Sequence, residues 1–198
     1  MDNDMTKEHS CDMREALIIA GINELELHGL ADFSLRRVAA ACGVSCAAPY
    51  RHFKNKDDLI LSIISYINRR WSMLFEHICE TYSHDAHRAL IEVCVANIRF
   101  WIANPNFRSI MMLDDSSLDS LQLREKSKIS DGVKELIHKY CDERGIDGED
   151  REKLTFGVRS ILYGAMQMLG SGELENTPKE MKMIRLCLED VIEVAKKG

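Results

Sequence analysis

The segment between Ser34 and Lys56 holds the side chains of this chain that are best suited to binding a polyanion. It has no acidic residue and five basic ones, which are Arg36, Arg37, Arg51, Lys54 and Lys56. The whole chain has 26 basic and 32 acidic residues and a net charge of −6, so the remainder carries −11. Neutralisation of phosphates supplies much of a protein's affinity for nucleic acid. Positive charge confined to one segment of an acidic chain therefore favours a contact with duplex DNA.

Two short helices joined by a glycine turn are predicted to position these side chains. Ser34 can cap the first helix, Gly43 supplies the turn, and Ser45 can cap the second. Lys56 stands at the start of a further helix, where free backbone N–H groups attract phosphate. Small side chains open the second helix and can lie close to base edges, and longer polar ones follow: Ser45, Cys46, Ala47 and Ala48, then Tyr50, Arg51 and His52. The second helix is therefore predicted to lie in the major groove.

The same residues resemble the DNA-binding pattern of the TetR (tetracycline-repressor) family of bacterial regulators. The strings that match are Ser34-x-Arg36-x-Val38-Ala39, Cys42-Gly43-Val44-Ser45 and Tyr50-x-His52-Phe53-x-x-Lys56-x-x-Leu59. The strong match covers about residues 12–65. The resemblance implies phosphate contacts by Ser34, Arg36, Tyr50, His52 and Lys56, and base contacts by Cys46, Ala47, Ala48 and Arg51. Together with Ser45, these residues form the predicted DNA-binding set.

The segment departs from the family pattern at two positions. Cys42 stands where alanine is common, which is a mild change. Pro49 stands where an aliphatic residue is common, and it removes a backbone donor early in the predicted recognition helix, so we expect a tight or irregular first turn. The alternative interpretation is a helical hairpin with a solvated basic face. Arg37 fits that alternative equally well, and it is not included in the predicted DNA-binding set.

Helical periodicity along the chain predicts an all-α fold of about nine helices. They are expected over about 12–28, from Ser34, from Ser45, from Asn55, over 86–103, from Pro105, over 118–144, over 147–169, and from Thr177 onward, with a loop at 114–117. In the first helix Ala16, Ile19, Ala20, Asn23 and Leu27 are expected to share one apolar side. We predict a helix-turn-helix DNA-binding domain over 12–58. A helical regulatory, ligand-binding and dimerisation domain is predicted over 59–198.

Other classes of function find little support in the sequence. The seven cysteines are scattered without a Cys-x-x-Cys pair, which favours reduced thiols, and the polar N-terminus does not resemble a signal peptide. A cytoplasmic protein without membrane attachment is expected. Cys79, His84 and His87 lie near one another but lack the spacing of a zinc site, so no metal is predicted. Because no catalytic or cofactor-binding motif occurs, we predict neither enzyme activity nor a cofactor.

Two apolar stripes near the C-terminus are predicted to form a homodimer interface. A single helix-turn-helix unit reads little DNA, so such proteins usually pair to read two half-sites. Two helices from each subunit would then pack as a four-helix bundle. The stripes are Leu154, Val158, Ile161, Ala165 and Met168 in one helix, and Met181, Ile184, Leu188, Val191 and Ala195 in the other. The alternative is that both stripes complete the core of the monomer.

Aromatic and methionine residues in the middle of the chain are the candidates for a ligand site. They are Trp71, Phe75, Phe100, Trp101, Met111, Met112, Phe156, Tyr163 and Met166. Such residues are more often core than pocket, but the resemblance implies a cavity for a small, largely apolar effector that releases a palindromic operator. Two alternatives stay open. One is a helix-turn-helix regulator controlled by a protein partner without a ligand, and the other is a helical cofactor-binding enzyme.

Overall fold

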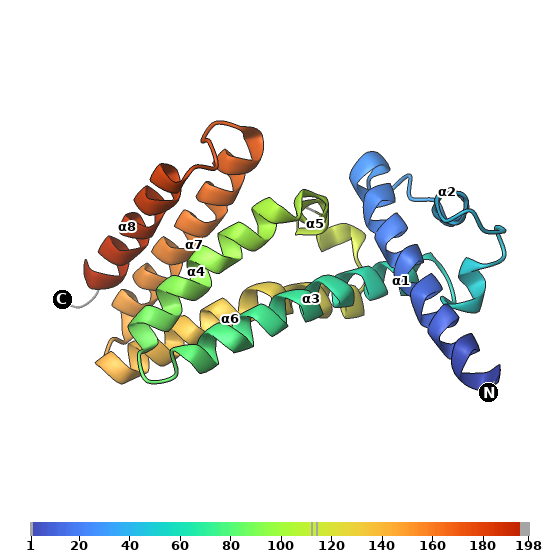
Figure 1. Ribbon diagram of the computed structural model, residues 1–198. Coiled ribbons are helices and arrows are strands. Elements are labelled where there is room, and N and C mark those ends of the chain that lie inside the picture. Colours follow the sequence, from blue (N-terminus) through green and yellow to red (C-terminus); the bar gives the residue numbers. More distant parts are fainter. Residues whose placement is uncertain (1, 112, 114, 195–198) are drawn as a thin grey trace. The chain divides into compact units, whose positions relative to one another are not determined.

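The computed structural model describes residues 2–111, 113 and 115–194. Within these ranges the chain forms eight α-helices, two short 3-10 segments and no strand (Figure 1). The prediction of an all-α fold is therefore confirmed. The helices are α1 (Asp2–His28), α2 (Leu35–Ala41), α3 (Lys56–Thr81), α4 (Ala86–Ala103), α5 (Pro105–Met111), α6 (Ser120–Arg144), α7 (Gly148–Ser171) and α8 (Pro178–Val194). The 3-10 segments are η1 (Pro49–Arg51) and η2 (Asp115–Ser117).

Capping groups close to each helix end set several of the observed boundaries. The side chain of Ser34 accepts the backbone N–H of Arg37 at 3.4 Å, and that of Asp85 accepts the N–H of Arg88 at 3.0 Å. α4 accordingly covers the range that was predicted for it. Gly172 ends α7 with a φ of 79°, a left-handed conformation that glycine adopts without steric penalty.

The face that α1 buries differs from the predicted one. Ile19 is 45% exposed and Leu27 is 75% exposed, so the inward stripe predicted for this helix is wrong. The side chains that lie inside are at most 2% exposed, and they are Leu17, Ile18, Ile22 and Leu25. Both sides of α1 carry apolar residues, and periodicity alone does not show which side the neighbouring helices cover.

The helices form two compact units, and each is described here by itself. The first unit comprises Met1–Arg69 and Asn106–Ser127, so α5 and the start of α6 belong with the N-terminal helices. In this unit the side-chain amide of Gln122 is 3% exposed and donates to the backbone carbonyl of Asp57 at 3.1 Å. Contacts between residues that are distant in sequence thus define a division other than the predicted boundary between residues 58 and 59.

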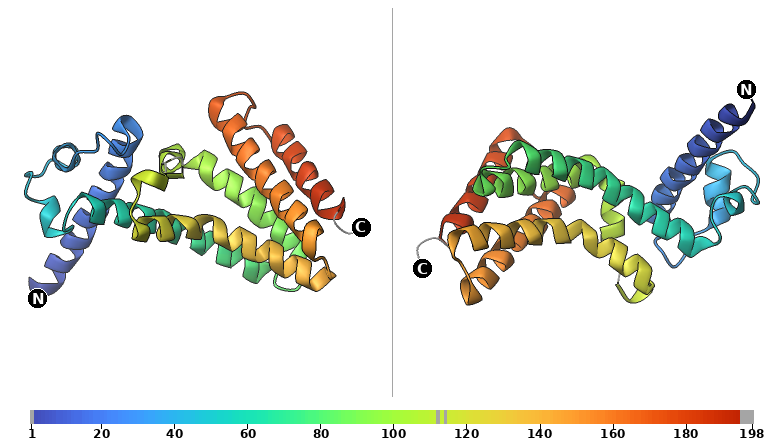
Figure 2. Two further views of the ribbon diagram at one scale, coloured as in Figure 1. Left: turned by 180° about the vertical axis from the view of Figure 1, so that it is seen from behind. Right: turned by 90° about the horizontal axis from the view of Figure 1, so that it is seen from below.

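The second unit comprises Arg70–Pro105 and Lys128–Gly198, and α4 lies at its centre. Ten consecutive or near-consecutive side chains of α4 are buried, among them Leu90, Val93 and Ile98 with no exposed surface. α4 contacts both α7 and α8, and these last two helices lie side by side in both views of Figure 2. Burial on nearly all sides explains why α4 is the most apolar helix of the chain.

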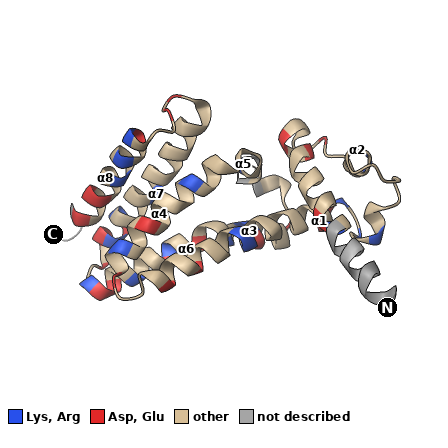
Figure 3. Cartoon of the chain, viewed as in Figure 1, with Lys and Arg blue, Asp and Glu red and all other residues tan. Residues whose placement is uncertain are grey.

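An ion pair joins α4 to α8 within the second unit. Both oxygens of Glu92 accept from the guanidinium of Arg185, at 3.0 and 2.9 Å. These hydrogen bonds lower the pKa of Glu92 and raise that of Arg185, because each favours the charged form. Basic and acidic residues both occur along α8 (Figure 3).

The described part of the chain has neither a membrane-spanning helix nor a cluster of metal-ligating side chains. No helix there is both long and apolar enough to cross a bilayer. The described residues likewise contain no group of three or more His, Cys, Asp or Glu side chains that could hold a metal ion, so Cys79, His84 and His87 are not brought together as one.

Candidate nucleic-acid interface

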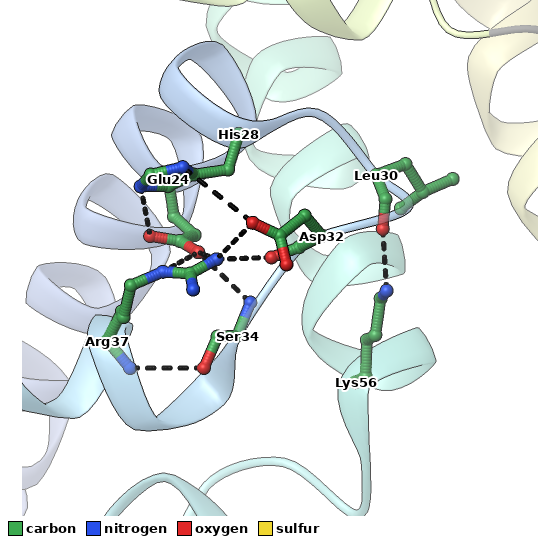
Figure 4. Close-up of polar contacts among 7 residues, drawn as sticks. All are labelled: Glu24, His28, Leu30, Asp32, Ser34, Arg37 and Lys56. Atoms are coloured by element: carbon green, nitrogen blue, oxygen red, sulfur yellow. Dashed lines mark hydrogen bonds and ion pairs between the residues drawn. The ribbon is translucent and has the colours of Figure 1, made fainter.

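A buried carboxylate on α1 anchors the start of α2 (Figure 4). Oε1 of Glu24 accepts the backbone N–H of Ser34 at 3.0 Å and the Nε–H of Arg37 at 2.7 Å. Glu24 is only 6% exposed, and Arg37 donates in addition to the backbone carbonyl of Asp32. A buried charge is tolerated when it is paired and hydrogen-bonded, as this one is. Glu24 therefore fixes the N-terminus of α2 against α1.

The two arginines of α2 differ in their surroundings. The hydrogen bond to Glu24 is the main reason that the pKa of Arg37 is raised, and the charge of Asp32 adds to it. Arg36 is exposed, and its side chain makes no hydrogen bond or ion pair with the residues that the structure describes. Arg36 is thus the member of the pair whose charge is not already paired with a carboxylate of the described residues, and leaving Arg37 out of the predicted set agrees with its ion pairs to Glu24 and Asp32.

A tight turn follows α2 where a third helix was predicted. Gly43 has a φ of 69°, and the backbone N–H of Val44 returns to the carbonyl of Ala39 at 3.0 Å. From Ser45 onward the backbone forms bonds between residues three apart, with Ala48 N–H donating to Ser45 at 2.9 Å. These bonds belong to turns and to η1 rather than to an α-helix. The predicted third helix is corrected, and the tight geometry expected from the proline is confirmed.

Two buried side chains hold this turn in place while the residues around them face outward. Pro49 is buried and Phe53 is 2% exposed, with the guanidinium of Arg14 from α1 lying 5.1 Å from the centre of the Phe53 ring. Tyr50 is 59% exposed. Among the other predicted DNA-binding residues of the turn, four are exposed, namely Ser45, Cys46, Ala47 and Arg51. Two are half-buried, namely Ala48 and His52. Most of the predicted reading surface is therefore accessible in the folded chain.

Lys56 has an internal contact that the sequence did not indicate. Its Nζ donates to the backbone carbonyl of Leu30 at 2.6 Å and lies 5.7 Å from the centre of the Phe33 ring. An ammonium group has three donors, so one bond to Leu30 leaves two for a phosphate. Asn55 caps the same helix end by accepting the backbone N–H of Asp58 at 2.9 Å. The phosphate contact of Lys56 stays a prediction, beside a structural role in holding the loop after α1.

Glu24 is the residue at this site that sequence reasoning missed. It follows Leu17 by seven residues and Gly21 by three, so all three share one side of α1. Leu17 has no exposed surface, and a Cβ on Gly21 would lie 2.8 Å from the side chain of Ile63. A carboxylate in the middle of a buried apolar face is unusual, and this position could have indicated that Glu24 has a structural role. It was overlooked because the opposite side of the helix was predicted to be buried.

Comparison with known proteins places this segment in a family. Residues 17–63 match the model of "Bacterial regulatory proteins, tetR family". The segment that carries the predicted DNA-binding residues is therefore similar to the TetR family. The solved structures agree in fold with nearly the whole chain. They include a TetR family transcription regulator from Marinobacter aquaeolei VT8, with a TM-score of 0.73 and 16% identity over 93% of this chain and 97% of that one. A TetR transcription regulator from Haloarcula marismortui has a TM-score of 0.68 and 19% identity, with coverages of 93% and 98%.

A curated relative is more similar in sequence than these two structures. The probable acrEF/envCD operon repressor of Escherichia coli K12 is 23% identical over 167 residues. The alignment covers 82% of this chain and 66% of the length of that relative. The similarity extends past the DNA-binding segment into the helical body. The resemblance inferred from the motif strings is therefore confirmed.

The predicted ligand-binding residues fall into separate places in the structure. Trp71, Phe100 and Phe75 form an aromatic cluster, with ring centres 5.5 Å apart for Trp71–Phe100 and 6.1 Å for Trp71–Phe75. Trp101 lies 5.4 Å from Phe100, and Met166 is buried at 8% exposure. The side chain of Met111 and all of Met112 lie outside the described residues. A cavity of about 210 Å³ borders Phe75 between α3, α4 and α6.

Two members of that predicted set lie on the outside of α7 instead. Phe156 is 74% exposed and Tyr163 is 42% exposed, so neither lines an internal cavity of the subunit. The guanidinium of Arg159 lies 5.9 Å from the centre of the Tyr163 ring, within reach of a cation–π contact. The aromatic composition that suggested a pocket here belongs to an exposed face.

The stripes predicted for the dimer interface pack mostly inside the subunit. Leu154, Val158, Ala165, Met181, Ile184 and Leu188 are buried at 0–7% exposure. Ile161 and Val191 are half-buried, Met168 is 38% exposed, and Ala195 lies outside the described residues. These side chains fill the space between α7, α8 and α4, which is the alternative that the sequence left open. The large apolar side chains left exposed on the two helices are Phe156, Tyr163, Met168, Met183 and Leu186.

Proposed function

We propose that this protein is a transcriptional regulator of the TetR family, and specifically a repressor, that binds a palindromic operator in duplex DNA as a homodimer. The observation that carries the proposal is the exposed turn of Cys46, Ala47 and Arg51, which the buried Pro49 and Phe53 hold in position. Small side chains at the centre of this turn permit close approach to base edges, and an arginine beside them can pair with guanine. The printed name of the Escherichia coli relative, an operon repressor, agrees with this function.

The charges around the turn support a contact with phosphates. Arg36, Arg51 and Lys54 are exposed, and their side chains make no hydrogen bond or ion pair with the described residues. Arg37 is neutralised by Glu24 and does not add to this field. Three accessible basic groups without acidic neighbours in the segment can replace the counterions of a DNA backbone.

The homodimer is supported by the exposed apolar residues of α7 and α8. Phe156 and Tyr163 project from α7, and Met183 and Leu186 from α8, with exposed fractions between 42% and 74%. The two helices lie side by side and contact each other. Pairing of this face with its copy would give a four-helix bundle, and a dimer carries the two DNA-binding turns that an operator with two half-sites requires. We propose these residues in place of the buried stripes.

A small, largely apolar effector is proposed to release the operator. Its site would lie in the helical body, where Trp71, Phe75 and Phe100 gather and where α3 continues from the DNA-binding segment. Release requires that the effector bind more tightly to the conformation that does not fit the operator.

Selection of bound genomic fragments by the purified protein tests the proposed function. We expect one or a few inverted-repeat sequences to be enriched, with an affinity that falls steeply as salt rises because phosphates are neutralised. Fluorescence anisotropy on the enriched fragment would then give the stoichiometry, which should be two subunits per site. Failure to retain any duplex at moderate salt would refute the proposal.

A further inference from the structure

A groove between α3 and α4 has the size and lining of a small-molecule site. It lies entirely within the second unit and has a volume of about 550 Å³, inside the roughly 300–1,000 Å³ that is usual for ligand pockets. It is lined by α3 from Leu74 to Thr81 with the following Tyr82, and by α4 from Glu92 to Ala103 with the following Asn104. Its apolar lining consists of Leu74, Ile78, Val95, Ala96, Phe100 and Ala103. The cavity beside Phe75 is a different one, since it involves α6 and shares only Tyr82 with this groove.

The guanidinium of Arg99 and the imidazole of His77 line the groove, and neither has a hydrogen-bond or ion-pair partner among the described residues. Both side chains are exposed. A guanidinium is always charged and presents several donors in one plane, which matches the two oxygens of a carboxylate. An unpaired arginine beside an apolar surface is therefore complementary to an anion with an apolar body.

The one carboxylate of the groove does not oppose such an anion. Both oxygens of Glu92 are occupied by Arg185, at 3.0 and 2.9 Å. The pKa of Glu92 is lowered first by these hydrogen bonds and further by the charges of Arg185, Arg88 and Arg99. The carboxylate of Glu92 is thus already paired with Arg185, and the charge of Arg99 is left for an anion in the groove.

We propose that this groove binds an amphipathic organic anion whose carboxylate pairs with Arg99 and whose apolar chain lies along Ile78, Val95 and Phe100. The proposal names the chemical class of the effector and in that respect rests on the proposed function. Along α4 and the residue that follows it, the lining runs from Glu92 to Asn104, or about 18 Å at 1.5 Å per residue. The volume of about 550 Å³ is that of a small-molecule pocket, whereas each partner in an ordinary protein interface buries about 800 Å² of surface, so the groove favours a small molecule over a partner helix.

Isothermal titration of the full chain without DNA tests this site. Decanoate serves as the probe, acetate as the same head group without a chain, and decyltrimethylammonium as the same chain with the opposite charge. We expect saturable binding of one decanoate per subunit, and binding at least about tenfold weaker for both comparison compounds. No saturable binding of decanoate, or equal binding of the cationic compound, would overturn the proposal.

Three variants locate the bound anion. Arg99→Gln should lower the affinity for decanoate about tenfold, because it removes a charge-assisted hydrogen bond, and Ala96→Trp should abolish binding by filling the groove. Arg69→Gln, at an exposed position on α3 away from the groove, should bind as the unaltered protein does. Unchanged affinity in both groove variants would place the anion elsewhere and overturn the proposal.

Sedimentation and operator binding separate the remaining outcomes. If Ala96→Trp changes the oligomeric state, the groove belongs to a subunit interface and the proposal is wrong. Anisotropy with the selected operator is measured on the same samples. If the unaltered protein binds the operator but not decanoate, only the groove assignment fails, whereas decanoate binding by an unaltered protein that retains no DNA would remove only the proposed function.

Discussion

Oε1 of Glu24 accepts the Nε–H of Arg37 at 2.7 Å and the backbone N–H of Ser34 at 3.0 Å, so one buried oxygen ties α1 to the start of α2. The bond to Arg37 pairs a basic side chain with an internal carboxylate in the most basic segment of the chain. In exchange, α2 gains a fixed orientation on α1. The arginine thus serves the folding of the DNA-binding segment, and its neighbour Arg36 remains available for DNA.

Glu24→Ala should lower the free energy of unfolding by about 1–3 kcal/mol, because the backbone N–H of Ser34 loses its acceptor. Urea denaturation followed by circular dichroism measures this change. Glu26→Ala is the matched control, since Glu26 lies on the same helix but is exposed. Equal stability of the two variants would show that the buried carboxylate does not hold α2.

Arg51→Ala should weaken binding to the selected operator by about 1–3 kcal/mol if the exposed guanidinium pairs with a guanine edge. Binding to unrelated duplex should change much less. Competition anisotropy with both duplexes gives the ratio of the two affinities. A proportional loss on both would assign Arg51 to the phosphates instead.

Lys56→Ala should reduce two properties at once, because Lys56 has two roles. The lost bond to the carbonyl of Leu30 should lower thermal stability, and the lost phosphate contact should reduce the salt slope of DNA binding by about one. Lys54→Ala, at an exposed position, should lower DNA affinity alone. A normal salt slope for Lys56→Ala would leave the residue with its structural role only.

Leu186→Asp should give folded monomers, because Leu186 is 48% exposed on the proposed dimer face and the new charge would be buried only in the dimer. Leu188→Asp should instead unfold the subunit, since Leu188 has no exposed surface. Sedimentation gives the mass, and circular dichroism gives the helix content. A dimer that persists in Leu186→Asp would place the interface on another face.

The Glu92–Arg185 pair should make stability depend on pH in the acid range. The pKa of Glu92 is lowered in the folded state by the hydrogen bonds from Arg185, so its contribution is complete above the ordinary glutamate pKa of about 4.3. The contribution is then lost as pH falls through the lower folded-state value. Glu92→Gln should therefore cost about 1 kcal/mol at pH 7 and progressively less below pH 4.

Urea midpoints across this pH range measure the effect, with Glu152→Gln at an exposed position of α7 as the control. A deficit in Glu92→Gln that is the same at pH 7 and at pH 3 would mean that its cause is packing and not charge.

Features that depend on neighbouring residues in the chain could be predicted from the sequence. Ser34, Asp85 and Gly172 set helix ends through bonds or backbone angles within a few residues of themselves, and those ends were predicted well. The motif between Ser34 and Leu59 likewise identified the DNA-binding segment. The tight turn could be predicted from Pro49, because the lack of a backbone N–H affects the hydrogen bonding of that turn itself.

The tertiary structure alone decided which of two apolar faces lies inside. On α1 the side with Leu17 and Ile22 is buried, whereas Ile19 and Leu27 are exposed. On α8 Leu188 is buried while Leu186 is exposed. A helix with apolar residues on both sides has nearly equal periodic signals for either orientation. Only the helices that pack against it remove one side from water, and those contacts come from residues far away in the sequence. For the same reason the role of Glu24 could not be predicted from the sequence. Its partners Ser34 and Arg37 could be identified only once the buried side of α1 was known.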